Sequence, residues 1–248
     1  MREGEIKNIR FKRGLWVLAL LSFVVAGASC ARLDSSRTEN QTKVMSENQS
    51  VSVIYTALGD STVAGVGTRE GGGYVARLFV RIKKERTDAR LTNLCVSGAT
   101  TEDVLRDQLT PAINSRPTLI TLGIGINDIG HGMAIQEFGS NYEDIVKRLK
   151  SETQAAIVLT NIPDISFAPV IAPSARRDLR DRIILFNERI EAVAKRYELS
   201  MVDVYSETHK VLPSHPEMFS DDGFHPSDAG YEYWAETMWP TVKTILSR

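Results

Sequence analysis

The sequence predicts an α/β protein built on a five-stranded parallel sheet covered by helices. Short apolar runs alternate along residues 51–248 with longer segments of helical periodicity. The short runs are apolar on both faces, which is typical of parallel strands buried between two layers of helices. About 200 residues remain after the N-terminal segment, a length suited to a single domain with its own core.

Five strands are expected, at residues 51–58, 91–96, 119–124, 155–160 and 201–204. Apolar residues at helical spacing predict helices over residues 74–82, 135–149 and 179–197. Another helix is expected to begin at Thr100 or Thr101, either of which can cap it, and to reach Leu109. The last helix is expected over residues 228–238, ended by Pro240.

The first 30 residues have the order of a secretory signal peptide. Basic residues precede an apolar run at residues 15–25, and the small residues 26–29 lead to Cys30. The run is shorter than the roughly 18 residues of a membrane-spanning helix, and an uncleaved membrane anchor is the alternative. Residues 31–50 are polar and are interpreted as a flexible linker to a folded domain at residues 51–248.

Cys30 follows small residues, as the cysteine of a bacterial lipobox does, and its lipidation would tether the chain to a membrane. Gly27 stands where a branched aliphatic residue is usual, and cleavage after Ala28 by an ordinary signal peptidase is the competing interpretation. The predicted location is therefore outside the cytoplasm. The chain is expected to be a periplasmic or cell-envelope lipoprotein, or otherwise a secreted protein.

The composition argues against several other classes of protein. The formal net charge is −1 and the pI is near 6.5, so no strongly basic face for nucleic acid is expected. Cys95 is the only cysteine besides Cys30, which leaves no disulfide framework and favours a small buried apolar role for Cys95. The four histidines lack zinc-ligand spacing, so neither a metal ion nor an organic cofactor is expected.

Polar residues or glycines follow three of the predicted strands, where ligands bind in open parallel sheets. Ser61 follows the first strand and is either a nucleophile or a cap of the next turn. Gly98 follows the second strand, where its N–H could donate to an oxyanion or the turn could simply require glycine. Asn127 follows the third strand, either as a neutral oxyanion donor or as a structural loop residue.

A histidine with a carboxylate three residues upstream precedes the last predicted helix. Asp222 can accept the Nδ1 proton of His225 and leave Nε2 free to act on a hydroxyl, whereas an exposed loop or a metal ligand is the alternative. Asp221, at a spacing of four, is not the expected partner. His131 could line the pocket. The remaining histidines, His209 and His215, have no carboxylate three residues upstream.

Together these segments resemble the four sequence blocks of the SGNH hydrolase superfamily, also called GDSL esterases and lipases. The blocks read GDSTVAG, NLCVSGAT, GIND and DDGFHP, and they span nearly the whole predicted domain. The resemblance implies a flavodoxin-like three-layer α/β/α sandwich and a catalytic triad of Ser61, Asp222 and His225. The implied oxyanion hole consists of the backbone N–H groups of Ser61 and Gly98 and the side chain of Asn127.

The function implied by the resemblance is ester hydrolysis through an acyl-enzyme on Ser61, with small acyl esters, thioesters or lysophospholipids as substrates. The alternatives are a carbohydrate O-acetylesterase of the cell envelope and a non-catalytic surface binding module. Thr62 stands where the family usually has leucine, which weakens any assignment to a subfamily. Residues 71–73 are interpreted as a mobile glycine loop near Ser61, and residues 162–177 as a wall or lid of the acyl pocket.

Overall fold

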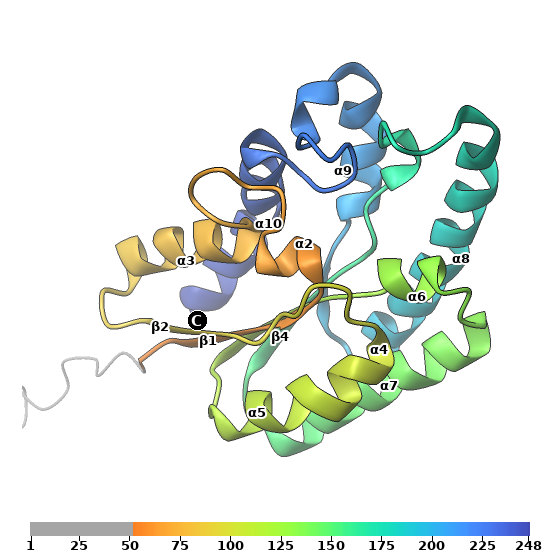
Figure 1. The fold of residues 1–248 in the computed structure, drawn as a ribbon. Helices are drawn as coiled ribbons and strands as arrows, with labels where there is room; N and C mark the ends of the chain where they lie inside the picture. The colour runs from red at the N-terminus through yellow and green to blue at the C-terminus, as the bar shows by residue number, and fades with distance from the viewer. Residues whose placement is uncertain (1–51) are drawn as a thin grey trace, which may run out of the picture. The chain divides into compact units, whose positions relative to one another are not determined.

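The computed structural model describes residues 52–248, and the predicted signal peptide, Cys30 and the linker lie outside the described residues. The described part contains one five-stranded parallel sheet with the strand order β2-β1-β3-β4-β5 (Figure 1). The strands are β1 (Ile54–Gly59), β2 (Arg90–Asn93), β3 (Leu119–Gly123), β4 (Ala156–Thr160) and β5 (Ser200–Val202). The five predicted strands are therefore confirmed, with boundaries that differ by a few residues.

Strand β1 lies between β2 and β3, and its register brings the ends of three strands together. Gly59, the last residue of β1, pairs with Gly123, the last residue of β3. Beyond β2 the chain continues beside β1, where the N–H of Leu94 donates to the carbonyl of Ala57 (3.0 Å) and the N–H of Val96 to that of Gly59 (3.2 Å). The residues that follow β1, β2 and β3 therefore start from the same edge of the sheet, the carboxyl edge.

Two layers of helices cover the sheet and complete a three-layer α/β/α sandwich (Figure 1). One layer consists of α3 (Tyr74–Glu85) and α10 (Asp228–Leu246). The other consists of α4 (Thr101–Asp103), the π-helix η1 (Val104–Gln108), α5 (Leu109–Asn114), α7 (Ile135–Glu152) and α8 (Arg176–Arg196). The shorter helices are α2 (Ser61–Ala64), α6 (Ile126–Gly130), η2 (Ile165–Phe167), η3 (Pro173–Ala175), α9 (Val204–Val211), η4 (Leu212–Ser214) and η5 (Pro216–Met218).

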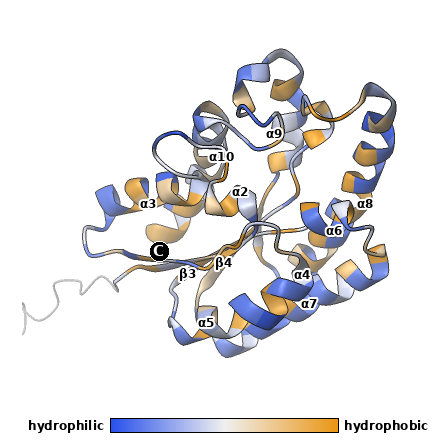
Figure 2. Ribbon diagram, in the orientation of Figure 1, coloured by the Kyte–Doolittle hydropathy of each residue, from blue (hydrophilic) through white to orange (hydrophobic). Residues whose placement is uncertain are grey.

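Each face of the sheet has its own hydrophobic core. Tyr55 and Ala57 of β1 pack toward α3 and α10, whereas Leu58 packs toward the opposite layer, as alternating strand side chains must. All three are fully buried. Figure 2 shows the matching pattern on the helices, whose hydrophobic residues face the sheet and whose hydrophilic residues face outward. Burying a large apolar side chain contributes roughly 1.5–3 kcal/mol, so these two cores hold the layers together.

The prediction that Pro240 ends the last helix is wrong, because α10 continues to Leu246. A proline inside a helix removes one backbone hydrogen bond and crowds the carbonyl four residues earlier. The turn beyond Pro240 nevertheless stays helical, since Val242 is fully buried and Ile245 and Leu246 pack against the same core. Tertiary packing here outweighs the local preference of proline.

The helix predicted from Thr100 or Thr101 begins with Thr100 as its cap. The Thr100 side chain accepts a hydrogen bond from the N–H of Asp103, and the Asp103 carboxylate accepts one from the N–H of Thr100 (2.9 Å). The helix extends beyond Leu109, because the π-helical turn η1 leads directly into α5. Such π-helical turns are often found at functional sites, where they redirect side chains.

Cys95 lies just beyond β2 and packs, partly buried, against the core formed by α3 and α10. Burial raises the pKa of its thiol well above the usual value. A thiol with a raised pKa is a poor nucleophile, in agreement with the apolar role that the sequence predicts. Within residues 52–248, no helix is both long enough and apolar enough to cross a membrane.

Candidate active site

Ser61 lies at the junction between β1 and α2 and is only 4% exposed. Asp60 caps α2, because its Oδ1 accepts hydrogen bonds from the N–H (2.9 Å) and the hydroxyl (2.7 Å) of Thr62. At the other end of this short helix, the N–H groups of Gly65 and Val66 both donate to the carbonyl of Ser61. The backbone of Ser61 is therefore held from both sides.

Gly59, which leads into this junction, is held by Gln108, a side chain that no sequence pattern indicated. Gln108 is buried in η1, where its Oε1 accepts from the N–H of Gly59 (2.9 Å) and its Nε2 donates to the Gly59 carbonyl (2.8 Å). Gly59 also touches β3, since a Cβ at this position would lie 2.2 Å from the carbonyl oxygen of Gly123. Only glycine fits here, and the end of β1 cannot move without displacing Gln108.

His225 and Asp222 complete a hydrogen-bonded line that begins at Ser61. His225 Nε2 lies 2.9 Å from Ser61 Oγ, and His225 Nδ1 lies 2.6 Å from Asp222 Oδ2. The spacing of three residues lets the Asp222 carboxylate bend back onto the imidazole ring. The arrangement can transfer a proton from the serine hydroxyl to the imidazole.

Asp222 is fixed within its own loop as a hydrogen-bond acceptor. Its Oδ1 accepts from the N–H groups of Phe224 (2.8 Å) and His225 (2.9 Å) and from the hydroxyl of Ser220 (2.8 Å). Partial burial acts to raise the pKa of Asp222, but these hydrogen bonds and the one to the His225 ring together lower it well below its usual value. An ionised carboxylate at this place fixes the tautomer of His225.

Gly98 and Asn127 follow the strands on either side of β1, and the structure links their segments. Asn127, in α6, donates from Nδ2 to the carbonyl of Ala99 (2.9 Å), the residue next to Gly98. Gly98 itself is exposed and has a φ of +81°, a conformation that favours glycine. The hydrogen bond therefore brings the amide of Asn127 to the segment that carries the N–H of Gly98.

Asp128, the residue after Asn127, links α6 to α4. It is fully buried and accepts hydrogen bonds from the N–H (3.0 Å) and the hydroxyl (2.5 Å) of Thr101. Burial raises the pKa of Asp128, although these hydrogen bonds act in the opposite direction. In the sequence Asp128 is only the last residue of the GIND block, whereas the structure gives it a role in joining the second and third sequence blocks.

Asp60 and Asp222, both near Ser61, have carboxyl groups whose pKa values are shifted in opposite directions. Burial raises the pKa of Asp60 to about 6, against the lowering effect of the hydrogen bonds from Thr62. The pKa of Asp222 is lowered instead, because more hydrogen bonds stabilise its ionised form. The surroundings of each carboxyl group, rather than its residue type, decide its charge.

An apolar pocket lies beside Ser61 and His225. The residues on either side of Ser61 and of His225 contribute to its lining, namely Asp60, Thr62, Phe224 and Pro226. Its apolar walls include Ile124, Ile126, Ile162, Ile165, Val204 and Leu212. A pocket of this composition can accept the apolar part of a small ligand.

The segment 162–177, predicted as a wall or lid, forms part of this pocket through Ile162, Pro163 and Ile165. It is anchored by Asp164, which is fully buried. The Oδ2 atom of Asp164 lies 2.7 Å from Nδ1 of His209, and 3.3 Å from Nε of Arg180. The near end of the segment is therefore a fixed wall.

Two residues near the site do not join it. His131 directly follows α6, is exposed, and does not line this pocket. Asp221 forms an exposed ion pair with Arg69 (2.5 Å), as expected for the carboxylate at the wrong spacing. Among residues 52–248, no group of three or more side chains is arranged to hold a metal ion.

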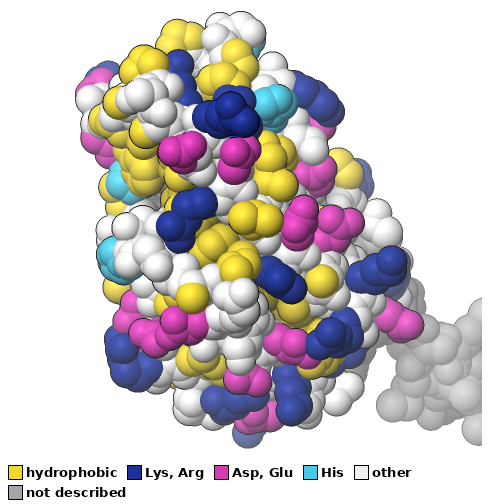
Figure 3. Space-filling view, turned by 90° about the vertical axis from the view of Figure 1, so that its right-hand side faces the viewer, with side chains coloured by type: hydrophobic (Ala, Val, Ile, Leu, Met, Phe, Trp, Pro, Cys, Tyr) yellow, Lys and Arg dark blue, Asp and Glu magenta, His cyan; other side chains and the backbone are white. Residues whose placement is uncertain are grey.

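The side of the molecule toward which the strand carboxyl ends point carries charges of both signs. Figure 3 shows this side with hydrophobic side chains over its middle and with basic and acidic side chains interspersed around them. A large field of a single sign is not visible on this face.

The model of the GDSL-like lipase/acylhydrolase family matches residues 57–233, a span that includes Ser61, Gly98, Asn127, Asp222 and His225. The chain belongs to this family. It is therefore a hydrolase that acts on ester bonds.

Relatives of known structure and sequence agree with this membership. Esterase TesA from Pseudomonas aeruginosa is 26% identical over 203 residues, which cover 82% of this chain and 94% of the relative. A crystal structure of TesA is similar with a TM-score of 0.63 at 27% identity, covering 77% of this chain and 99% of that chain. The acetylxylan esterase Axe2 from Geobacillus stearothermophilus has a similar fold, with a TM-score of 0.64 at 20% identity over 77% of this chain and 95% of that chain. The fold is that of the SGNH hydrolases.

Proposed function

We propose that this hydrolase cleaves carboxylic esters and thioesters of apolar acyl groups through an acyl-enzyme on Ser61. The proposal rests on the line of hydrogen bonds from Ser61 Oγ to His225 Nε2 (2.9 Å) and from His225 Nδ1 to Asp222 Oδ2 (2.6 Å). Such a line supplies the serine hydroxyl with a base, and supplies the base with an ionised partner.

In the proposed reaction, His225 Nε2 accepts the hydroxyl proton as Ser61 Oγ attacks the carbonyl carbon of the ester. The tetrahedral intermediate then loses the alcohol, which receives its proton from His225. Water, deprotonated in turn by His225, attacks the acyl-enzyme, and the acid is released as His225 returns the proton to Ser61 Oγ. Asp222 stays ionised in both steps and stabilises the imidazolium.

The proposed oxyanion donors are the backbone N–H groups of Ser61 and Gly98 and the Nδ2 of Asn127. Two observations support them. The three residues follow the adjacent strands β1, β2 and β3, and the hydrogen bond from Asn127 to Ala99 (2.9 Å) joins two of the segments. Neutral N–H donors suit an oxyanion that exists only in the transition state and the intermediate.

The apolar pocket beside Ser61 supports an apolar acyl group as the part of the substrate that is recognised. Small acyl esters, thioesters and lysophospholipids all carry such a group. A carbohydrate O-acetylesterase is the second candidate, suggested by the likeness in fold to an acetylxylan esterase. The apolar lining favours the first candidate, because isoleucine, valine and leucine side chains recognise an alkyl chain rather than the hydroxyl groups of a sugar.

The decisive experiment compares hydrolysis of p-nitrophenyl acetate, butyrate and octanoate by the wild type and by Ser61→Ala. We expect hydrolysis to increase with chain length up to the limit of the pocket, to vanish in Ser61→Ala, and a fluorophosphonate probe to label the wild type at Ser61. Release of acetate from acetylated xylan without hydrolysis of butyrate would support the O-acetylesterase. A folded wild type with neither activity nor labelling would support a non-catalytic binding module.

We also propose that the chain is exported and tethered to a membrane by a lipid on Cys30. The order of basic, apolar and small residues before Cys30 supports this proposal. Cys30→Ser should move the protein from the membrane fraction to the soluble fraction of the cell envelope. A mature wild-type chain that begins at Ser29 would instead establish cleavage after Ala28 by an ordinary signal peptidase.

A further inference from the structure

The segment between α2 and α3, residues 65–73 (the 65–73 loop), is closed at its base. A Cβ on Gly65 would lie 2.3 Å from the nitrogen of Gly73, and a Cβ on Gly73 would lie 2.6 Å from the Cα of Gly65. Loops of this length whose ends meet form compact surface structures. The loop begins directly after the helix that starts with Ser61, so it is connected to the nucleophile by the shortest possible path.

The closed loop touches the segment that carries His225. Gly67 has a φ of +96°, and a Cβ there would lie 2.7 Å from the carbonyl oxygen of Pro226, 2.8 Å from Ser220 Oγ and 3.0 Å from His225 Cβ. Ser220 Oγ also donates to Asp222 (2.8 Å). The backbone at Gly67 therefore packs against three residues around the Asp222–His225 pair, and any shift of the loop would be transmitted to them.

A second contact fastens the base of the loop to α10. The hydroxyl of Tyr231, a fully buried residue of α10, donates to the carbonyl of Val66 (2.7 Å). Because α10 begins three residues after His225, the helix holds both the loop and the end of the His225 segment.

Asp228 and Arg77 hold the tip of the loop. Asp228, the first residue of α10, accepts hydrogen bonds from the N–H groups of Arg69 (3.0 Å) and Glu70 (3.3 Å). Arg77 of α3 donates to the carbonyls of Glu70 (2.9 Å) and Gly72 (3.1 Å) and to the Asp228 carboxylate (2.6 Å). The glycines that the sequence suggested as a mobile loop are thus fastened by one guanidinium and one carboxylate.

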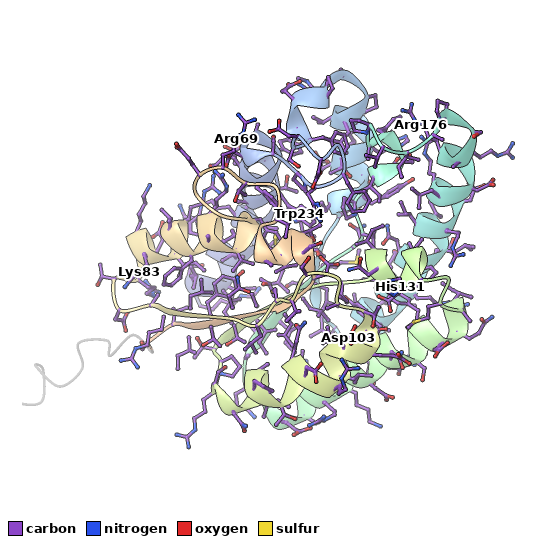
Figure 4. All side chains as sticks on the ribbon, viewed as in Figure 1. Arg69, Lys83, Asp103, His131, Arg176 and Trp234 are labelled. Carbon is purple, nitrogen blue, oxygen red and sulfur yellow. The ribbon has the colours of Figure 1, made fainter. Side chains whose placement is uncertain are left out.

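The contacts of Arg77 with Glu70, Gly72 and Asp228 differ from the surface ion pairs around them. The Arg77 side chain is only 15% exposed and its planar guanidinium meets several acceptors at once, which is the geometry in which arginine binds most specifically. The neighbouring pair of Arg69 with Asp221 is 76% and 85% exposed, and exposed pairs of this kind contribute little. Figure 4 shows Arg69 on the loop, at the outer surface.

We infer that the 65–73 loop, clamped by Arg77 and Asp228, positions His225 for proton transfer from Ser61, an inference that rests on the proposed acyl-enzyme function. Arg77 and Asp228 are positioning residues, because they touch neither the nucleophile nor the imidazole. They act through the contact of Gly67 with His225. A small displacement of His225 reduces turnover because proton transfer requires aligned partners, whereas binding of the apolar acyl group is left largely unchanged.

The test compares Arg77→Met with Arg81→Met, a matched control one turn further along α3. Both arginines bond to Glu232 (3.0 Å for Arg77 and 2.6 Å for Arg81), but only Arg77 holds the loop and Asp228. We expect Arg77→Met to lower kcat for p-nitrophenyl butyrate about 10- to 100-fold with little change in KM. The acid limb of the pH dependence of kcat/KM should also shift in Arg77→Met. Arg77→Lys should restore part of kcat. Arg81→Met should leave kcat and the pH profile near wild type.

A kcat of Arg77→Met within twofold of that of Arg81→Met would overturn the inference. Equal changes in KM and equal losses of thermal stability in both variants, without a specific loss of kcat in Arg77→Met, would likewise assign Arg77 a purely structural role. Should Arg77→Met lose its cooperative unfolding transition, Asp228→Asn carries the same test with a smaller change in shape. Fluorophosphonate labelling of wild-type Ser61 distinguishes failure of the proposed function from failure of the positioning role of Arg77. Without that labelling the proposed function fails, and with it only the positioning role is in question.

Discussion

Two aspartate–histidine pairs in this molecule have nearly the same geometry and very different surroundings. In one pair, Asp222 Oδ2 lies 2.6 Å from Nδ1 of His225, and the far nitrogen of that imidazole contacts Ser61 Oγ at 2.9 Å. In the other, Asp164 Oδ2 lies 2.7 Å from Nδ1 of His209. The distances alone do not distinguish a pair that can transfer protons from one that holds a wall in place.

The surroundings of the second pair are those of an anchor. Asp164 also lies 3.3 Å from Nε of Arg180, whose guanidinium is 4.8 Å from the centre of the Phe167 ring. The His209 ring is stacked at 5.8 Å from that of Tyr205. Charge pairing and aromatic packing thus fix the pocket wall. An aspartate–histidine hydrogen bond becomes catalytic only when the far nitrogen of the imidazole meets a nucleophile.

The strongest way to separate the two pairs is to neutralise each carboxylate in turn. Asp222→Asn should lower kcat about 10,000-fold, because the amide no longer fixes the tautomer that can accept the Ser61 proton. Asp164→Asn should leave kcat within about tenfold, since it acts only on the pocket wall. Steady-state hydrolysis of p-nitrophenyl butyrate measures both. Equal losses of kcat would show that the comparison is wrong.

A smaller loss of activity is expected when one of the proposed oxyanion donors near Ser61 is removed. Asn127→Ala should lower kcat about 100- to 1000-fold, the usual effect of removing one oxyanion donor. The rate of fluorophosphonate labelling should fall with it, because that reaction also develops charge on an oxygen in the same site. Undiminished kcat in a folded Asn127→Ala protein would remove Asn127 from the oxyanion hole.

The carboxyl group of Asp60, next to the proposed nucleophile Ser61, allows a test based on the stability of the protein. Burial raises the pKa of Asp60 from 3.8 to about 6, so the native state binds this proton more tightly than the unfolded state does. The stabilisation by the protonated form is complete below pH 3.8 and is lost as pH rises through about 6. Relative to Asp60→Asn, the free energy of unfolding of the wild type should fall by up to about 3 kcal/mol as the pH rises across this window. Urea unfolding of both proteins between pH 4 and 8 measures the difference, and a constant difference would contradict the raised pKa.

The smallest effect is expected from the loss of stability in Asp164→Asn. Asp164→Asn should lower the free energy of unfolding by about 1–2 kcal/mol, because the partners His209 and Arg180 are partly exposed and regain hydration. Thermal unfolding measures this loss, and a free energy of unfolding equal to that of the wild type would show that Asp164 does not anchor the pocket wall.

Much of the site could be predicted because its residues follow local rules. Ser61, Gly98 and Asn127 stand after strands that apolar periodicity reveals, and the spacing of Asp222 to His225 is short enough for one loop. The supporting residues carry no such signal. Gln108 acts on Gly59 over 49 residues, and Arg77 acts on Asp228 over 151 residues, so only the packed structure brings them together. The prediction that the last helix ends at Pro240 is wrong for the same reason, since the burial of Val242 is a long-range effect.

The sequence by itself determined the order of strands and helices, the buried faces of each, and the pairing of Asp222 with His225. These properties depend on side-chain periodicity and on contacts within a few residues. The tertiary structure alone decided which aspartate–histidine pair would meet a serine, because Ser61 and His225 are 164 residues apart in the chain. Their meeting depends on the parallel strand order and on the packing of α10 against α3. Both arise from burial of apolar surface over the whole domain, which is why no local pattern contains them.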